Sequence, residues 1–580
     1  MEFFWSDIQD GMRREFNVDI MMDDGVPMRA DVFRPIDDGK YPVILTYGPY
    51  AKGLHFEDGY AYAWNNMVTD YPDALAGTSN LYQSWEVVDP EKWVPDGYVC
   101  LRVDSRGTGC SPGYVDHFSP RETQDLIQCI DWAAKQPWSN GKVGMNGISY
   151  YAMNAWIVAA QNPPGLEAIC IWEGCSDWYR DGSRHGGILS IFWAEWYDRQ
   201  VKSVQYGLGN RGRKSRVTGQ NISGEVTMDD AELAQNRCNL GDELVNRKLD
   251  EQYYRDRSAK YEDIRVPLLS CGNWCGDGLH IRGNFEGYLF AGTDQKWLEA
   301  HGGNHWAPFY TDYGTELQKK FFGHFLKGEG TGWDKQERVQ LQIRRPGQKF
   351  QQFELRMENE WPLARTQYTK YYLTPDYMLA PGQPTAGKSL TYEAMGGGLT
   401  FLTEPFEQDM EITGHAAAKL FLSSDTVDAD LFLALRLFTP DLKEVTFEGA
   451  VDSNMALSLG WLRVSQRKLD EKRSTEWRPY HTHDERQPLT PGQVYEADVE
   501  MMPTCIVVPK GYRLGLSVRG KDYEVANRPL PYGPWNNWSG TGFFRHTEAR
   551  DRVPEIFHNN VTLHFDEKNA PYILLPVIPE

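Results

Sequence analysis

The stretch GKVGMNGISYYA, residues 141–152, decides the fold of this chain. Its apolar residues 143–146 predict a short strand, and a helix is expected from Tyr150 to Gln161, where Asn162 and two prolines follow. Between them lie Gly147 and Ser149, so a strand, a sharp turn with serine and a helix follow one another directly, as in a nucleophile elbow. Such a turn raises the Ser149 hydroxyl above the sheet edge, beside the amide groups and partial positive charge of the helix N-terminus.

The surrounding sequence supplies the rest of a parallel sheet. Near-continuous apolar runs predict strands covered on both faces over residues 41–47, 97–103 and 166–172. Between the second run and the elbow, Ser119, Pro120 and Glu122 form a capping-box pattern, and apolar residues recur at helical spacing through to Gln136. Alternating strands and helices predict βαβ units in a doubly wound α/β domain.

Changes in pattern divide the chain into four segments. Residues 1–175 form the first part of the α/β core, and residues 176–262 lose the strand pattern in favour of charged, aromatic and helical stretches. The α/β pattern resumes over 263–345, with strands expected over 266–271 and 296–302, so 176–262 is interpreted as an insertion. Residues 346–580 carry short strands separated by turn signals, which predicts an all-β sandwich.

Composition narrows the class of protein. The 580 residues include 81 Asp and Glu against 60 Lys and Arg, a formal charge of −21, which disfavours nucleic acid and anionic membranes as partners. No apolar run is long enough to span a membrane, and the first residues lack the basic and apolar regions of a secretory signal. Nine cysteines scattered among apolar runs are typical of reduced core thiols. A cytoplasmic location is therefore expected, and the oligomeric state, a homo-oligomer included, stays open.

A serine nucleophile requires a base and an acid that orients the base. In open α/β sheets both groups are expected just past strand ends, and the acid comes before the histidine in the chain. His305 follows the strand expected over 296–302, whereas His301 lies inside it, so His305 is the predicted base. Asp277 follows the strand expected over 266–271 and is the predicted acid, with Glu173 as the alternative and a solvated turn as the non-functional interpretation.

At these residues the chain resembles the superfamily of serine hydrolases that contains cocaine esterase, X-prolyl dipeptidyl aminopeptidase and α-amino-acid ester hydrolase. The resemblance covers nearly the whole chain. It rests on the segments YGPYAK (47–52), RVDSRGTGCSPG (102–113), DW (131–132), QPWSNG (136–141), GISY (147–150), LTEP (402–405), EITG (411–414) and PKGYRL (509–514). It implies an α/β-hydrolase core with a mostly parallel sheet, an inserted helical cap and a C-terminal jelly-roll β-sandwich.

The resemblance also implies roles for particular residues. Ser149 corresponds to the nucleophile, and the Tyr50 hydroxyl and the Tyr150 backbone N–H correspond to the oxyanion hole. Two departures matter: Ala152 stands where the family usually has glycine, and Gly276 stands where the family has its acid, with Asp277 one residue later. Asp277 serves only if its loop carries one extra residue, and otherwise Glu173 or another carboxylate orients the base.

Other motifs predict less. The glycine-rich stretch 104–113 lacks the signature of a phosphate-binding loop. The histidines at 481 and 483 and the cysteines at 271 and 275 do not belong to larger ligand clusters. No metal and no cofactor is therefore expected. With 20 Trp, 31 Tyr and 25 Phe, aromatic pocket walls are plausible beside large cores. The substrate-lining candidates are Trp172, His185, Trp193, Trp196, Trp274 and Trp306.

The sequence therefore predicts a serine esterase that cleaves a small-molecule carboxylic ester through an acyl-enzyme on Ser149. One alternative is an amide-directed enzyme, that is, an X-prolyl dipeptidyl peptidase or an α-amino-acid ester or β-lactam acylase. Such an enzyme could use Glu173, Asp177 and Asp181 to hold a substrate ammonium. An acyltransferase on the same residues and, from another class, a non-catalytic carbohydrate-binding or scaffold protein also stay open.

Overall fold

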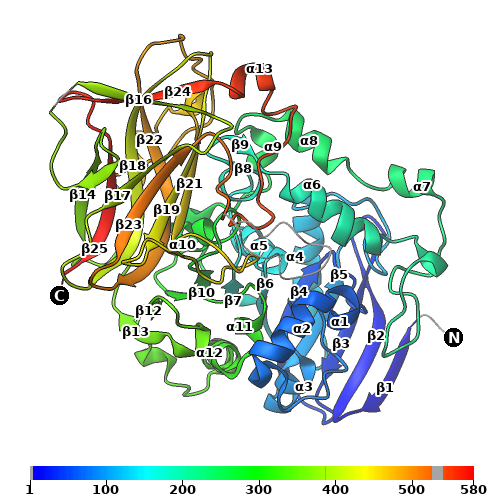
Figure 1. The fold of residues 1–580 in the computed structure, drawn as a ribbon. Helices are drawn as coiled ribbons and strands as arrows, with labels where there is room; N and C mark the ends of the chain where they lie inside the picture. Colours follow the sequence, from blue (N-terminus) through cyan, green and yellow to red (C-terminus); the bar gives the residue numbers. More distant parts are fainter. Residues whose placement is uncertain (1–3, 386, 526–539, 580) are drawn as a thin grey trace.

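The computed structural model describes residues 4–385, 387–525 and 540–579 (Figure 1). Its first large sheet has the strand order β1-β2-β3-β5-β4-β6-β7-β10-β11-β12-β13. The strands from β5 to β12 in this order are mutually parallel, and antiparallel strands extend both edges. The strands of this sheet are β1 (Trp5–Gln9), β2 (Met12–Met21), β3 (Pro27–Arg34), β4 (Tyr41–Gly48), β5 (Val99–Asp104), β6 (Ser139–Ile148), β7 (Leu166–Trp172), β10 (Leu268–Asn273), β11 (Lys296–His301), β12 (Val339–Ile343) and β13 (Glu354–Glu358).

Helices cover both faces of this sheet, as the near-continuous apolar strands require. On one face lie α4 (Pro120–Ala134) and α5 (Tyr150–Ala159), which bury Ile130 and Trp156 against the strands. On the other face lie α3 (Pro90–Trp93) and α12 (Asp312–Phe322), whose Trp93 and Phe322 pack together. The predicted α/β-hydrolase core is confirmed. Strand β13 lies past the boundary expected at 345 and still pairs with β12.

The capping pattern at the start of α4 forms in part as the sequence predicts. The Ser119 hydroxyl accepts the backbone N–H of Glu122. The Glu122 carboxylate does not return to Ser119; it accepts the N–H of Phe118 and the phenol O–H of Tyr150. The cap of α4 is therefore joined to the first residue of α5, beside the elbow.

Short elements make up the segment between β7 and β10. It contains a π-helical turn (Trp178–Ser183), the hairpin β8 (Arg184–His185) and β9 (Ile188–Leu189), and the helices α6 (Phe192–Trp196), α7 (Asp230–Gln235), α8 (Leu240–Asn246) and α9 (Gln252–Arg255). Figure 1 shows these elements above the end of the sheet where α5 begins. A second covering segment, not recognised in the sequence, lies between β4 and β5 and contains α1 (Phe56–Gly59) and α2 (Ala61–Asp70).

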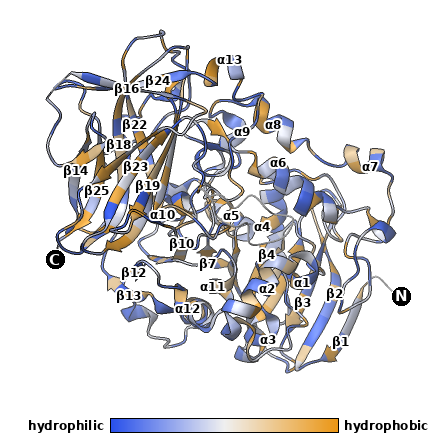
Figure 2. Cartoon of the chain, in the orientation of Figure 1, coloured by the Kyte–Doolittle hydropathy of each residue, from blue (hydrophilic) through white to orange (hydrophobic). Residues whose placement is uncertain are grey.

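The C-terminal strands form a second sheet that closes on itself, because β25 pairs with both β14 and β18. Residues alternate in hydropathy along β23, which Figure 2 shows in colour, and Leu514, Leu516 and Val518 enter the core. This is the predicted β-sandwich domain. Its strands are β14 (Gln367–Leu373), β15 (Met378–Ala380), β16 (Lys388–Glu393), β17 (Leu399–Thr403), β18 (Met410–Ser424), β19 (Asp430–Phe438), β20 (Glu444–Val445), β21 (Ser458–Arg463), β22 (Tyr495–Val508), β23 (Arg513–Arg519), β24 (Asn560–Phe565) and β25 (Tyr572–Ile578).

Within the described part of the chain, no helix combines the length and the apolar character that crossing a bilayer requires.

Candidate active site

The elbow after β6 has the strained geometry that its sequence predicts. Ser149 has φ 57° and ψ −114°, an unusual conformation for a residue with a side chain. A Cβ atom on Gly147 would lie 2.7 Å from the Tyr151 Cβ, so only glycine fits there. Ala152, the departure from the family pattern, faces Gly174, where an added Cβ would lie 2.6 Å from the Ala152 Cβ. Because Gly174 has no side chain, there is room for the methyl group of Ala152 at the position where the family usually has glycine.

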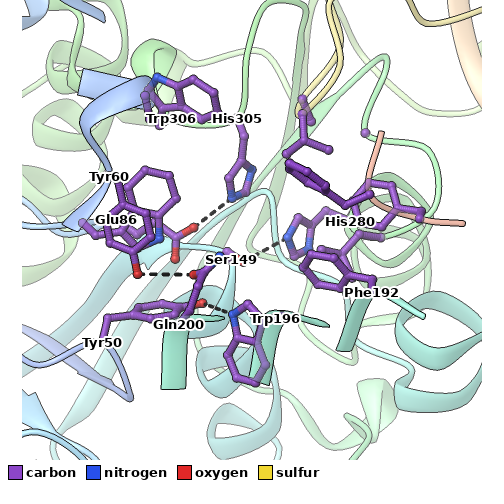
Figure 3. A pocket seen from close by; sticks show the side chains of 18 of the residues that line it. Tyr50, Tyr60, Glu86, Ser149, Phe192, Trp196, Gln200, His280, His305 and Trp306 are labelled. Carbon is purple, nitrogen blue, oxygen red and sulfur yellow. Dashed lines mark hydrogen bonds and ion pairs between the residues drawn. The ribbon is translucent and has the colours of Figure 1, made fainter. Parts of the chain in front are cut away.

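The Ser149 hydroxyl contacts a histidine that the sequence analysis did not single out. His280 Nε2 lies 3.1 Å from Ser149 Oγ (Figure 3). The other ring nitrogen of His280 accepts the backbone N–H of Cys175 at 3.0 Å. A neutral imidazole that accepts at Nδ1 carries its proton on Nε2, so His280 donates to Ser149 Oγ. Burial and the neighbouring His305 lower the pKa of His280 well below its ordinary value, which keeps this ring neutral.

His305 lies against the same site between two carboxylates. Its Nδ1 lies 2.8 Å from Glu173 and its Nε2 lies 2.9 Å from Glu86. Its ring stacks on that of His280, with centroids 5.2 Å apart and planes inclined by 8°. His305 therefore shares a pocket with Ser149, as predicted, but its Nε2 is directed at Glu86 in this state.

The charges at the site are distributed unequally. Although burial opposes it, pairing with Glu173 and Glu86 raises the pKa of His305 to about 10. Burial raises the pKa of Glu86 to about 7, partly offset by its bond to His305. Glu173 is also buried, but the charges and hydrogen bonds of His305 and His301 lower its pKa to about 2. Glu173 is the permanent anion of the group, and His305 is an imidazolium at neutral pH.

The prediction that Asp277 orients His305 is wrong in this structure. The Asp277 carboxylate accepts the N–H of Leu459 in the β-domain, and its other oxygen has no hydrogen-bond partner in the described part of the chain. Burial raises the pKa of Asp277 to about 8, so the group is mostly protonated at neutral pH. The loop after β10 turns this side chain toward β21, whereas Glu173, the alternative named from the sequence, stands directly after β7 and reaches His305.

The serine and both histidines line a cavity of about 840 Å³, its opening included. The wall is mainly aromatic and comes from three parts of the chain: the core, the inserted segments and the β-domain. It includes the predicted Trp193, Trp196 and Trp306 and the unpredicted Tyr60, Trp85, Phe192, Phe544 and Val451. Figure 3 shows Ser149 between Glu86 and His280 at its base.

Three other lining candidates lie elsewhere. Trp172 is fully buried in β7 and stacks on His301. Trp274 is fully buried and donates its indole N–H to the Gln342 carbonyl. His185 bonds to His546 of the β-domain. Membership of the inserted segment or closeness in sequence to the site does not fix the direction of a side chain.

The two oxyanion-hole candidates lie at the site. The Tyr50 side chain lines the cavity. Its hydroxyl oxygen accepts the indole N–H of Trp196 at 3.1 Å, so the hydroxyl proton of Tyr50 is not used in the bond to Trp196. Tyr150 is the first residue of α5, where a backbone N–H has no partner inside the helix. Burial raises the pKa of Tyr50 well above its ordinary value, which keeps the phenol protonated.

Across residues 4–385, 387–525 and 540–579, no three His, Cys, Asp or Glu side chains converge in an arrangement suited to a metal ion.

Comparison with known proteins identifies the class. Residues 24–307 match the family model of the X-Pro dipeptidyl-peptidases (S15 family), and residues 331–569 match the model of the X-Pro dipeptidyl-peptidase C-terminal non-catalytic domain. The protein is a serine hydrolase with an α/β-hydrolase core. It belongs to the superfamily of cocaine esterases, X-Pro dipeptidyl-peptidases and α-amino-acid ester hydrolases.

Individual relatives span nearly the whole chain. A cocaine esterase from Rhodococcus sp. is 24% identical over 97% of this chain and 98% of its own. A putative Xaa-Pro dipeptidyl-peptidase from Rhodopirellula baltica is 23% identical over 87% of this chain and 82% of its own. A crystal structure of a CocE/NonD family hydrolase from Staphylococcus aureus has a TM-score of 0.82 and 28% identity over 98% of this chain and 94% of its own.

Proposed function

We propose that this protein hydrolyses a carboxylic ester through an acyl-enzyme on Ser149. The observation that carries the proposal is the strained Ser149 at the base of an aromatic cavity that His305 also lines, with His305 Nδ1 bonded to the buried Glu173. These residues supply the nucleophile, base and orienting acid that acyl transfer requires, provided that His305 Nε2 turns from Glu86 to Ser149.

His305 is proposed as the general base, and Glu173 as the acid that orients it. A base needs an unprotonated nitrogen facing the nucleophile and a carboxylate on its other nitrogen. His305 has the carboxylate at 2.8 Å. Neither histidine presents an unprotonated nitrogen to Ser149 in this state, because His305 Nε2 faces Glu86 and the Cys175 N–H places the proton of His280 on Nε2. Only His305 has the carboxylate on its other nitrogen, since Nδ1 of His280 is occupied by the Cys175 N–H.

In the proposed reaction, Ser149 Oγ attacks the ester carbonyl while His305 Nε2 takes the serine proton. The Tyr50 hydroxyl and the Tyr150 N–H donate to the developing oxyanion, and His280 Nε2–H donates to Oγ as it gains negative charge. His305 then returns the proton to the departing alcohol. Water attacks the acyl-enzyme with His305 again as base, which frees the acid and restores Ser149.

The cavity favours a neutral ester over a substrate with a free amine. The three carboxylates that the sequence suggested for holding an ammonium are already engaged: Glu173 by two histidines, Asp177 by Arg180, and Asp181 by Arg282. Glu86, which lines the cavity, is bonded to His305. The side chains around the serine are mainly aromatic, which suits an apolar acyl or alcohol group. Acyl transfer to an alcohol in place of water would use the same residues.

A substrate panel tests this proposal. Purified protein is assayed with p-nitrophenyl acyl esters, α-amino-acid p-nitrophenyl esters and Xaa-Pro p-nitroanilides, with Ser149→Ala as the control. We expect turnover of uncharged acyl esters that is lost in Ser149→Ala. A preference of kcat/KM for a free α-amino group would favour the amide-directed alternative, and undiminished turnover by Ser149→Ala would refute the serine mechanism.

A further inference from the structure

We propose that Glu86 is a positioning residue for the base: it holds His305 turned away from Ser149 and accepts the proton that His305 must lose before attack. This inference rests on the proposed function, because it assigns the base to His305. No motif in the sequence analysis pointed to Glu86.

Direct contact is the first support. Glu86 Oε1 lies 2.9 Å from His305 Nε2, the nitrogen that has to accept the serine proton. The carboxylate is 2% exposed, and its Oε2 has no hydrogen-bond partner in the described part of the chain. Glu86 itself lines the cavity with Ser149. While this bond persists, the base has no free lone pair.

Backbone geometry is the second support. Glu86, Ser149 and Glu173 are all non-glycine residues with positive φ, at 64°, 57° and 45°. The Glu86 carbonyl accepts the N–H of Ile148 at 3.0 Å, and the Glu173 carbonyl accepts the N–H of Ser149 at 3.1 Å. The backbone of the elbow is thus hydrogen-bonded to Glu86 and to Glu173, the two residues whose carboxylates contact His305. Strained backbone of this kind persists where the surrounding structure fixes a functional geometry.

The proton balance defines the step. In the resting state the Nε2–H bond of His305 points at the Glu86 carboxylate. The bond breaks, the proton forms an O–H bond on Glu86 Oε1, and the electron pair stays on Nε2. An imidazolium and a carboxylate become a neutral imidazole and a carboxylic acid, so the net charge of the site does not change. His305 keeps its Nδ1–H bond to Glu173 and now has a lone pair for the serine proton.

The groups around the pair allow this transfer. His305 faces Glu173 and Glu86 and stacks on neutral His280. Besides His305, Glu86 interacts electrostatically with the neutral phenols of Tyr50, Tyr60, Tyr151 and Tyr310 and with the buried Glu173. Burial raises the pKa of Glu86 to about 7, which brings proton acceptance within reach.

The test compares Glu86→Gln with the wild type by the pH dependence of kcat/KM for an uncharged p-nitrophenyl ester. Removing one of the two carboxylates lowers the pKa of His305, so the acid limb of the profile is expected about 1–3 pH units lower. In the variant His305 loses this proton to solvent instead of to Glu86, and its lower pKa leaves more of the imidazole neutral, so activity near pH 7 rises. The matched control is Glu448→Gln, a half-buried carboxylate with a raised pKa that bonds to Tyr71 and Asn304, and it is expected to leave the limb in place.

A second measurement does not depend on turnover. Histidine-selective ¹⁵N spectra are recorded of the Ser149→Ala protein and of the double variant Ser149→Ala/His305→Gln. The signal that is missing from the double variant is assigned to His305. Its titration midpoint is expected at lower pH when Glu86→Gln is added. An unmoved midpoint, or a Glu86→Gln rate that falls at every pH without a shift of the limb, would overturn the assignment of Glu86.

The two proposals fail separately. If Ser149→Ala keeps full turnover, the proposed function fails. If Ser149→Ala is inactive and His305→Gln is strongly impaired while the limb in Glu86→Gln stays in place, only the role of Glu86 fails.

Discussion

Replacing Glu173 by glutamine tests which carboxylate orients the base. Glu173 is fully buried after β7 and contacts His305 Nδ1 at 2.8 Å, His301 Nε2 at 3.2 Å and the Asn273 amide at 3.2 Å. Glutamine has the same shape, so packing is retained while the charge is lost. The amide also removes the preference for a proton on His305 Nδ1.

The size of the effect follows from the electrostatics of the site. Its partners lower the pKa of Glu173 from its ordinary 4.5 to about 2, against the opposing effect of burial. At about 1.4 kcal/mol per pH unit, the ionised form is favoured by about 3 kcal/mol, or roughly 10²-fold. Loss of the correct imidazole tautomer adds to this, and a carboxylate-to-amide change in a serine protease triad costs about 10⁴-fold in kcat. We therefore expect kcat of Glu173→Gln to fall by about 10²–10⁴-fold.

The assay is steady-state hydrolysis of a p-nitrophenyl acyl ester, with thermal unfolding as a check on folding. The matched variant is Asp277→Asn, which replaces a protonated acid by an amide of similar shape away from the serine. Because this change is isosteric and lies outside the site, kcat is expected to stay within about two-fold of the wild-type value. If Asp277→Asn loses most of its kcat while Glu173→Gln retains its own, the acid assignment drawn from the structure is refuted.

Further expected outcomes concern stability, the second histidine and the oxyanion hole. Burial raises the pKa of Asp277 to about 8 in the folded protein, whereas its pKa in the unfolded chain is near 4. The stability that the protonated group contributes is therefore complete below about pH 4 and is lost as the pH rises through 8. The unfolding temperature of Asp277→Asn should exceed that of the wild type by an increasing margin from about pH 5 to 8.5. Calorimetry across that range with parallel curves would contradict this. His280→Ala removes the donor on Ser149 Oγ, so kcat should fall about 10–100-fold with KM little changed; a complete loss equal to that of His305→Ala would instead mark His280 as the base. Tyr50→Phe should lower kcat about 10²–10³-fold as an oxyanion donor is removed, whereas Tyr47→Phe, in the preceding strand β4 and outside the cavity lining, should not. Equal kinetics of the two phenylalanine variants would exclude Tyr50 from the oxyanion hole.

The sequence predicts those parts of the site that depend on local pattern. The strand predicted at 166–172 agrees with β7, and the elbow places Ser149 because strand, glycine, serine and helix follow within a few residues. His305 could be found because catalytic groups of an α/β sheet follow strand ends, and Glu173 could be named for the same reason.

What the sequence cannot predict depends on long-range packing. Asp277 and Glu173 each follow a strand, and only the three-dimensional path shows that the first faces Leu459 and the second faces His305. His280 lies immediately before α10 (Ile281–Phe290), so no strand end marks it, and a histidine within three residues of Asp277 was the available signal. Glu86 belongs to the segment between β4 and β5, whose role over the site depends on its bond to the elbow.

Covalent labelling of the nucleophile tests the central claim most directly. The protein is treated with a fluorophosphonate, digested and mapped by mass spectrometry, with Ser149→Ala treated in parallel. We predict one phosphonylated peptide containing residues 147–152 with the adduct on Ser149, and no adduct in the variant. An adduct on another residue together with full ester turnover by Ser149→Ala would contradict the account.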